Sequence, residues 1–144
     1  MNKKGFTIIE LLVVIAIIGL LTAVILVSLG TARQRGADAG KIRSVAEVKS
    51  ALNFYFNDFD AGNGKYPLTV ELSSKLVPKY LASIDPNIKY YSLNGSTYHL
   101  GIALAGSDNK VLSSDKDDIS GFRGLSITCG AIPSGTDYCY DVTP

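Results

Sequence analysis

The sequence predicts an α+β fold in which a long N-terminal α-helix packs against a small antiparallel β-sheet. The first observation is an apolar N-terminal stretch that continues into a segment with apolar residues every three or four positions, the spacing of one helix face. The second is an Asn-Gly pair between two tyrosine-rich, strand-like runs, which is typical of a β-hairpin. Such a sheet buries its apolar face against the apolar stripe of the helix.

Composition limits the classes of function. The chain has 144 residues, a formal net charge of +1 and 19% charged residues, which fits one modest domain plus a membrane element. This balance of charge gives no reason to require nucleic acid as a partner. No Gly-rich phosphate loop follows a predicted strand, and His99 is the single histidine, so no Ser-His-Asp set is available. We therefore expect that the chain is not an enzyme and that His99 is a surface or edge residue.

The N-terminal stretch is long enough to cross a membrane. The uncharged run Leu11–Ala32 would be about 33 Å long as a helix, against a hydrocarbon core of about 30 Å. A secretory signal peptide cut near Gly30-Thr31-Ala32 and a plain membrane anchor are the alternatives. The run is longer than the apolar region of a signal peptide, and neither alternative explains the acidic residue Glu10 near its start. The flanking basic residues are nearly balanced and do not fix the orientation.

The predicted helix continues beyond the membrane segment. It would extend from Phe6 to Phe59, about 80 Å, and stop before the breaker Gly62-Asn63-Gly64. In its second half the pattern is amphipathic, and the apolar stripe consists of Ile42, Val45, Val48, Leu52, Tyr55, Phe56 and Phe59.

The remaining chain predicts the sheet. Val70–Tyr80 has the spacing of a short helix, and Asp85-Pro86-Asn87 is a turn. The hairpin pairs Ile88–Leu93 with Thr97–Leu104 through Asn94-Gly95, which favours a two-residue type I′ turn. We expect a third strand over Leu125–Cys129.

Two cysteines, Cys129 and Cys139, lie near the C-terminal end. Their spacing differs from a CxxC redox motif, and one histidine leaves a zinc site without further good ligands. A disulfide in an exported domain is the favoured interpretation, and two unpaired thiols are the alternative.

The residues Lys3-Lys4-Gly5-Phe6, followed by Glu10 at the fifth position after the glycine, resemble the start of the type IV pilins and pseudopilins. The resemblance implies that prepilin peptidase cuts after Gly5 and methylates the new amine of Phe6. It also implies that Glu10 pairs with the N-terminal amine of a neighbouring subunit. Residues 1–5 would then be the leader, 6–30 the transmembrane and filament-core helix, and 31–144 a soluble domain with the pilin-like helix-on-sheet fold.

By this resemblance the protein is a structural subunit that assembles with its own copies into a helical, type IV pilus-like filament. Its other expected partners are the prepilin peptidase, the assembly platform of a pilus or type II secretion system, and the membrane before assembly; nucleic acid is not required. The precursor is expected as a single-pass protein of the cytoplasmic membrane and the filament as extracellular or periplasmic. The alternatives are a major pseudopilin of type II secretion and a minor tip pilin that binds a surface or DNA.

The loop from Gly106 to Ile119 is acidic and rich in hard oxygen donors, the ligands that calcium prefers. It resembles the calcium loop of the major pseudopilins, with Asp108 on its first acid and Asp118 on its last acidic pair. Lys116 replaces another acid of that loop, and the double glycine of the family is absent. Calcium is the one expected cofactor, and a solvated polar loop is the alternative. The candidate ligands are Asp108, Asp115, Asp117 and Asp118.

Overall fold

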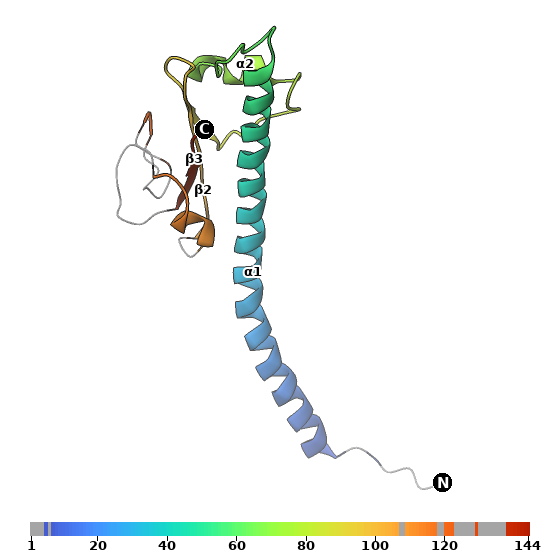
Figure 1. Ribbon diagram of the computed structural model, residues 1–144. Helices are drawn as coiled ribbons and strands as arrows, with labels where there is room; N and C mark the ends of the chain where they lie inside the picture. The colour runs from blue at the N-terminus through green and yellow to red at the C-terminus, as the bar shows by residue number, and fades with distance from the viewer. Residues whose placement is uncertain (1–4, 6, 107–108, 118–119, 123–128, 130–137) are drawn as a thin grey trace. The chain divides into compact units, whose positions relative to one another are not determined.

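The computed structural model describes Gly5, residues 7–106, 109–117 and 120–122, Cys129 and residues 138–144, without the side chains of 24 and 26–28. The chain divides into two compact units, Met1–Gln34 and Arg35–Pro144. Along the chain (Figure 1) the elements are α1 (Ile8–Asn57), η1 (Thr69–Glu71), α2 (Leu72–Leu76), β1 (Lys89–Tyr91), β2 (His99–Ala103), η2 (Lys110–Ser113) and β3 (Cys139–Val142).

The predicted α+β fold is confirmed in the second unit, where α1 packs against a three-stranded antiparallel sheet (Figure 1). Val45, Val48 and Leu52 are at most 1% exposed and lie three or four positions apart, so they form one face of the helix. They share an apolar core with Leu100 and Ile102 of β2. The apolar stripe that the sequence predicted is therefore the surface that meets the sheet.

The end of α1 differs slightly from the prediction. The helix ends at Asn57, and Phe59 is 81% exposed, so its assignment to the buried stripe is wrong. The chain then folds back, because the Gly62 N–H donates to the Tyr55 carbonyl at 3.1 Å. A Cβ atom at Gly62 would lie 2.2 Å from that carbonyl oxygen, so only glycine fits there.

Asp58, which directly follows α1, binds the segment that comes after α2. The Lys79 Nζ donates to the Asp58 carboxylate at 2.7 Å, and the Tyr80 hydroxyl donates to the same oxygen. Hydrogen bonds from Lys79 and Tyr80 lower the pKa of Asp58 to about 2. This contact fixes the segment that follows α2 against the last turn of α1.

The predicted helix over Val70–Tyr80 is shorter in the structure. A 3-10 turn, η1, leads into α2, which ends at Leu76. Val77 is extended, with ψ of 134°, and the residue before a proline avoids the helical region because the ring of Pro78 clashes with it. The turn at Asp85 is confirmed, since the Ile88 N–H donates to the Asp85 carbonyl at 3.0 Å.

The hairpin is confirmed but its turn is not of type I′. β1 pairs with β2 through Tyr91 and His99, so the connecting loop runs from Ser92 to Tyr98. Gly95 has φ of +74°, but Asn94 is not among the residues with positive φ, whereas type I′ needs both. The loop is long because the backbone of Ser92 bonds to Thr69 rather than across the hairpin, at 2.9 and 3.1 Å.

The third strand of the described sheet is β3, which the sequence analysis did not predict. The sheet order is β1-β2-β3, with Leu100 opposite Val142 and Ala103 opposite Cys139. Residues 125–128 of the expected strand lie outside the described residues. β2 is therefore central, with one face against α1. On its other face Phe122 covers Gly101, where a Cβ would lie 2.9 Å from the Phe122 ring.

Candidate functional site

Gly5 is the expected cleavage position at the N-terminus. Gly5 is exposed, and among the described residues other than its chain neighbours no atom lies within 4 Å of the position that a Cβ would take. An enzyme would therefore have free access to the backbone of this residue. Phe6, the expected methylation site, lies outside the described residues.

Glu10 caps its own helix. Its Oε2 accepts hydrogen bonds from the Thr7 N–H at 2.9 Å and from the Thr7 Oγ1 at 2.8 Å. In return the Glu10 N–H donates to Thr7 Oγ1 at 3.3 Å. This reciprocal pair is a capping box, which satisfies two backbone donors at the start of α1. The Thr-x-x-Glu spacing in the sequence is its usual signal, and the sequence analysis did not use it.

The helix that follows Glu10 exposes an apolar surface. In the first unit the described large apolar side chains between positions 8 and 29 range from 44% exposed at Leu29 to 85% at Ile8. They include Ile9, Leu11, Leu12, Ile15, Ile17, Ile18, Leu20, Leu21 and Ile25. Over the residues that the structure describes, no helix qualifies as long and apolar enough to span a membrane.

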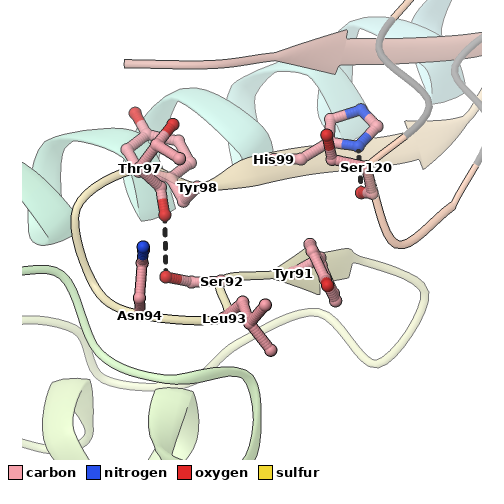
Figure 2. A pocket seen from close by; sticks show the side chains of 8 residues that line it. All are labelled: Tyr91, Ser92, Leu93, Asn94, Thr97, Tyr98, His99 and Ser120. Carbon is pink, nitrogen blue, oxygen red and sulfur yellow. Dashed lines mark hydrogen bonds between the residues drawn. The ribbon is translucent and has the colours of Figure 1, made fainter.

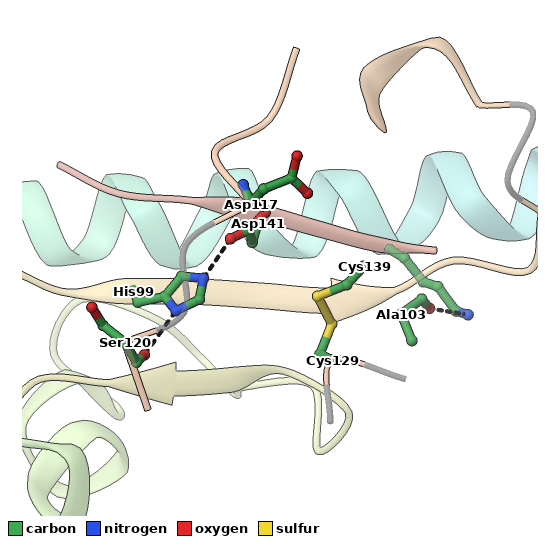
Figure 3. Close-up of a disulfide and its surroundings, with 8 residues drawn as sticks. His99, Ala103, Asp117, Ser120, Cys129, Cys139 and Asp141 are labelled. Atoms are coloured by element: carbon green, nitrogen blue, oxygen red, sulfur yellow. Dashed lines mark hydrogen bonds and ion pairs between the residues drawn. A yellow bond between two sulfur atoms is a disulfide. The ribbon is translucent and has the colours of Figure 1, made fainter. Parts of the chain in front are cut away.

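The second candidate site is a group of three carboxylates. Ligand atoms of Asp115, Asp117 and Asp141 lie within 4.8 Å of one another. Two of these are candidates from the sequence, and the third comes from β3 (Figure 3). The other two candidates, Asp108 and Asp118, lie outside the described residues. Asp141 was missed because it is 24 residues from Asp117 along the chain and in a strand that the sequence did not predict.

Asp141 joins this group to the interior of the domain. It is fully buried, and its Oδ2 lies 2.5 Å from Nε2 of His99. Its Oδ1 accepts the Asp117 N–H at 3.1 Å. Both oxygens of this carboxylate therefore have protein partners.

His99 is a core residue, so the expectation of a surface or edge position is wrong. It is 1% exposed in the central strand, and its ring stacks on Phe122 at 3.7 Å between centroids. Its Nδ1 lies 2.8 Å from the Ser120 carbonyl (Figure 3). Both ring nitrogens therefore lie within hydrogen-bond distance of an oxygen, which fixes the orientation of the ring.

The electrostatic effect of the group is visible at its neighbour Tyr140. Burial, followed by the negative charges of Asp115 and Asp141, raises the pKa of the Tyr140 hydroxyl. The region is therefore one in which a cation is favoured and a further anion is not.

A disulfide holds the strand that carries Asp141. Cys129 and Cys139 are bonded, with Cα atoms 5.0 Å apart, and both are buried (Figure 3). Cys139 begins β3 and lies opposite Ala103 in the sheet. The bond thus fixes the segment at Cys129 to the end of the strand, beside the ring of Phe122.

An open pocket of about 360 Å³ lies beside the loop that joins β1 and β2 (Figure 2). Its lining consists of Tyr91, Ser92, Leu93, Asn94, Thr97, Tyr98, His99 and Ser120. The one histidine in this lining is His99, and both of its ring nitrogens lie within hydrogen-bond distance of an oxygen. Within the described residues the pocket therefore presents no nucleophile with an adjacent free base.

The N-terminal segment of the chain matches a known family profile. A family profile described as "Prokaryotic N-terminal methylation motif" matches residues 1–26, the segment with Gly5, Phe6 and Glu10. The chain thus carries a methylation motif at the start of a long helix, and the second part of that helix packs on a small sheet.

Comparison with known proteins finds relatives of two kinds. The chain is 28% identical to the type II secretion system core protein G of Klebsiella michiganensis, over 78% of this chain and 75% of that protein. It is 34% identical to a fimbrial protein of Neisseria meningitidis over 59% of each chain. It is 60% identical to the type IV wide pilus major component PilA4 of Thermus thermophilus, over 54% of this chain and 59% of that protein. The chain is thus similar both to a type II secretion core protein and to type IV pilus subunits. A comparison with solved structures finds no match.

Proposed function

We propose that the chain is a structural subunit of a type IV pilus-like filament. Its precursor is inserted in the cytoplasmic membrane, cleaved after Gly5, methylated on the amine of Phe6 and polymerised through α1. One observation carries this proposal: the methylation motif over residues 1–26 leads directly into a helix whose large apolar side chains are exposed.

The apolar surface of the first unit supports polymerisation. Exposing apolar side chains to water on all sides of a helix is unfavourable, so we expect this surface to be buried against lipid or protein. In the precursor this surface contacts lipid. Once the subunit leaves the membrane, it packs against the same segment of other copies. Glu10 at the start of the helix then pairs with the Phe6 amine of a neighbour, which fixes the axial position of each copy.

The N-terminal residue of the mature protein tests this proposal. We expect intact-mass and N-terminal analysis of the membrane or filament fraction to find a chain that starts at N-methylated Phe6. A Gly5→Leu variant should accumulate as the full-length precursor, because the added side chain fills the open space at the cleavage site. Normal cleavage of Gly5→Leu, or a mature chain that starts near Gln34, would contradict the proposal.

A type II secretion pseudopilin is the second candidate function. The relative named core protein G is aligned over 78% of this chain, more than either pilus relative. The cluster of Asp115, Asp117 and Asp141 in the second unit also agrees with the resemblance of this loop to the calcium loop of the pseudopilins. Sheared surface filaments separate the candidates: a pilus subunit should be abundant in them, a tip subunit scarce and a pseudopilin absent.

We also propose that the second unit binds calcium in the loop that ends near Asp118. The oxygen donors of Asp115 and Asp117 are close enough to share one ion, and Asp108 and Asp118 are the remaining candidate ligands. Asp141 supplies negative charge beside them while its own oxygens bond to the protein. Calcium would neutralise the mutual repulsion of these carboxylates and order the loop.

Thermal unfolding with calcium and with a chelator tests this second proposal. By linkage, calcium at a hundredfold excess over its Kd should stabilise the fold by about 2.7 kcal/mol and raise the Tm accordingly. The Asp117→Ala variant, which removes an exposed carboxylate, should lose most of that increase. Magnesium in place of calcium is the control for general screening of charge. If calcium does not change the Tm of the wild-type protein, the loop is a solvated polar loop and the calcium proposal is wrong.

A further inference from the structure

The loop between β1 and β2 carries Asn94 followed by Gly95 (Figure 2). We propose that Asn94 is a site of spontaneous deamidation, at which the folded chain converts its own asparagine to aspartate and isoaspartate. The structure provides a polarised carbonyl on the exposed side chain of Asn94 and a backbone nitrogen at Gly95 without a hydrogen bond among the described residues, and water is the one co-reactant.

The side-chain carbonyl of Asn94 is polarised by its neighbour Ser96. Its Oδ1 accepts a hydrogen bond from the Ser96 N–H at 3.1 Å and a second from the Ser96 hydroxyl at 2.6 Å. Attack on the amide carbon places negative charge on this oxygen, and two donors already directed at it stabilise that charge. The Asn94 side chain is exposed and lines the open pocket, so ammonia can leave and water can enter.

The nucleophile is the backbone nitrogen of Gly95. Glycine has no Cβ, so nothing on the residue itself shields this nitrogen. Its N–H donates no hydrogen bond among the residues that the structure describes. The carbonyl end of Gly95 is held instead, because its oxygen accepts the Tyr66 N–H at 2.8 Å. Gly95 is buried against Tyr66, but its nitrogen has no hydrogen bond among the described residues that must break before it attacks the exposed Asn94 side chain.

The reaction balances without an oxidant or a metal. The Gly95 nitrogen forms a bond to Cγ of Asn94, the bond from Cγ to Nδ2 breaks, and the amide proton of Gly95 leaves with the nitrogen as ammonia. Water then adds to one of the two carbonyls of the resulting five-membered imide, and a C–N bond breaks. Hydrolysis at Cγ gives aspartate, and hydrolysis at the backbone carbonyl gives isoaspartate.

The chain contains one other Asn-Gly pair, Asn63-Gly64, and the structure protects it. The Gly64 N–H donates to the Phe56 carbonyl at 2.9 Å, so this bond must break before the nitrogen can attack. No donor to the Asn63 side chain is found within the described part of the chain. Two identical dipeptides thus differ in both the nucleophile and the carbonyl, and we expect only Asn94 to react readily.

The product changes the charge of the protein. One added carboxylate takes the formal net charge of the chain from +1 to zero. If the chain assembles as proposed above, the change is repeated in every modified subunit of a filament. The modification itself does not depend on that assembly.

The test is peptide mapping of the purified full chain in detergent, incubated in buffer made with ¹⁸O-labelled water. We expect labelled carboxylate at Asn94 to form at least about tenfold faster than at Asn63. In denaturant the hydrogen bonds at both sites are lost, so the two rates should become similar. Equal rates in the folded chain, a faster reaction at Asn63, or no conversion at Asn94 would overturn the proposal.

The Ser96→Ala variant tests the cause of the selectivity. Ser96 is exposed, so this change removes the hydroxyl donor without opening the core. The Asn94 rate should fall, by about threefold or more, while the Asn63 rate should not change. An unaltered Asn94 rate would show that Ser96 does not activate the carbonyl. A glycan on Asn94, which heads an Asn-Gly-Ser acceptor sequence, would also contradict the proposal, because it blocks the nitrogen that must leave.

Discussion

The Glu10→Ala variant is expected to be cleaved after Gly5 as usual and to yield no sheared filaments. In the assembled state its neighbour's amine would remain unpaired in an apolar core, at a cost of about 3–5 kcal/mol for each contact. The capping box is lost as well, which destabilises the start of α1 by about 1 kcal/mol. The measurement is the yield of sheared filaments together with the amount of processed subunit in the membrane.

Two further variants separate the charge of Glu10 from its capping role. Glu10→Gln keeps a side-chain oxygen that can accept the Thr7 N–H, since glutamine also completes a capping box, but it carries no charge. Thr7→Ala removes the hydroxyl and keeps the charge. We expect Glu10→Gln to fail in assembly and Thr7→Ala to assemble. The reverse pattern would mean that Glu10 acts through the helix end alone.

The Asp141→Ala variant is expected to lose about 3–5 kcal/mol of the free energy of unfolding of the second unit. It leaves the buried His99 ring and the Asp117 N–H without their acceptor. The measurement is urea unfolding of a fragment that starts at Thr31, followed by circular dichroism.

Asp117→Ala is the control for Asp141→Ala, since it removes a carboxylate of the same group that is exposed. In the absence of calcium it should change the free energy of unfolding by no more than about 0.5 kcal/mol. The His99→Ala change should cost far less in the Asp141→Ala background than in wild type, because the two residues are in direct contact. Additive effects of the two changes would refute the idea that they act as a pair.

The features that local sequence determines were predicted well. Val45, Val48 and Leu52 repeat with the helical period, and they are buried on the helix face that meets the sheet. The hairpin was found because its strands are close in sequence and flank an Asn-Gly pair. The break before Pro78 was missed, although the proline in the printed sequence is the signal for it.

The features that depend on distant partners were not predictable. His99 looked like a surface residue because its partner Asp141 is 42 positions further along the chain. The strand β3 has four residues, one of them an aspartate, which is uncommon in strands. Here the carboxylate is accepted in the interior because His99 and the Asp117 N–H satisfy it. Of the candidate calcium ligands, the sequence identified two that lie together and missed the charge beside them.

The place of β3 in the sheet also sets the order in which the second unit can fold during synthesis. β2 lies between an earlier strand and one formed by residues 139–142, so its second row of hydrogen bonds forms only after residues 139–142 have been made. Until then the segment after α1 lacks the strand that holds Asp141, and Cys139 is not yet available to Cys129. The central strand therefore stays half-paired, and the disulfide unformed, until the residues of β3 have been made.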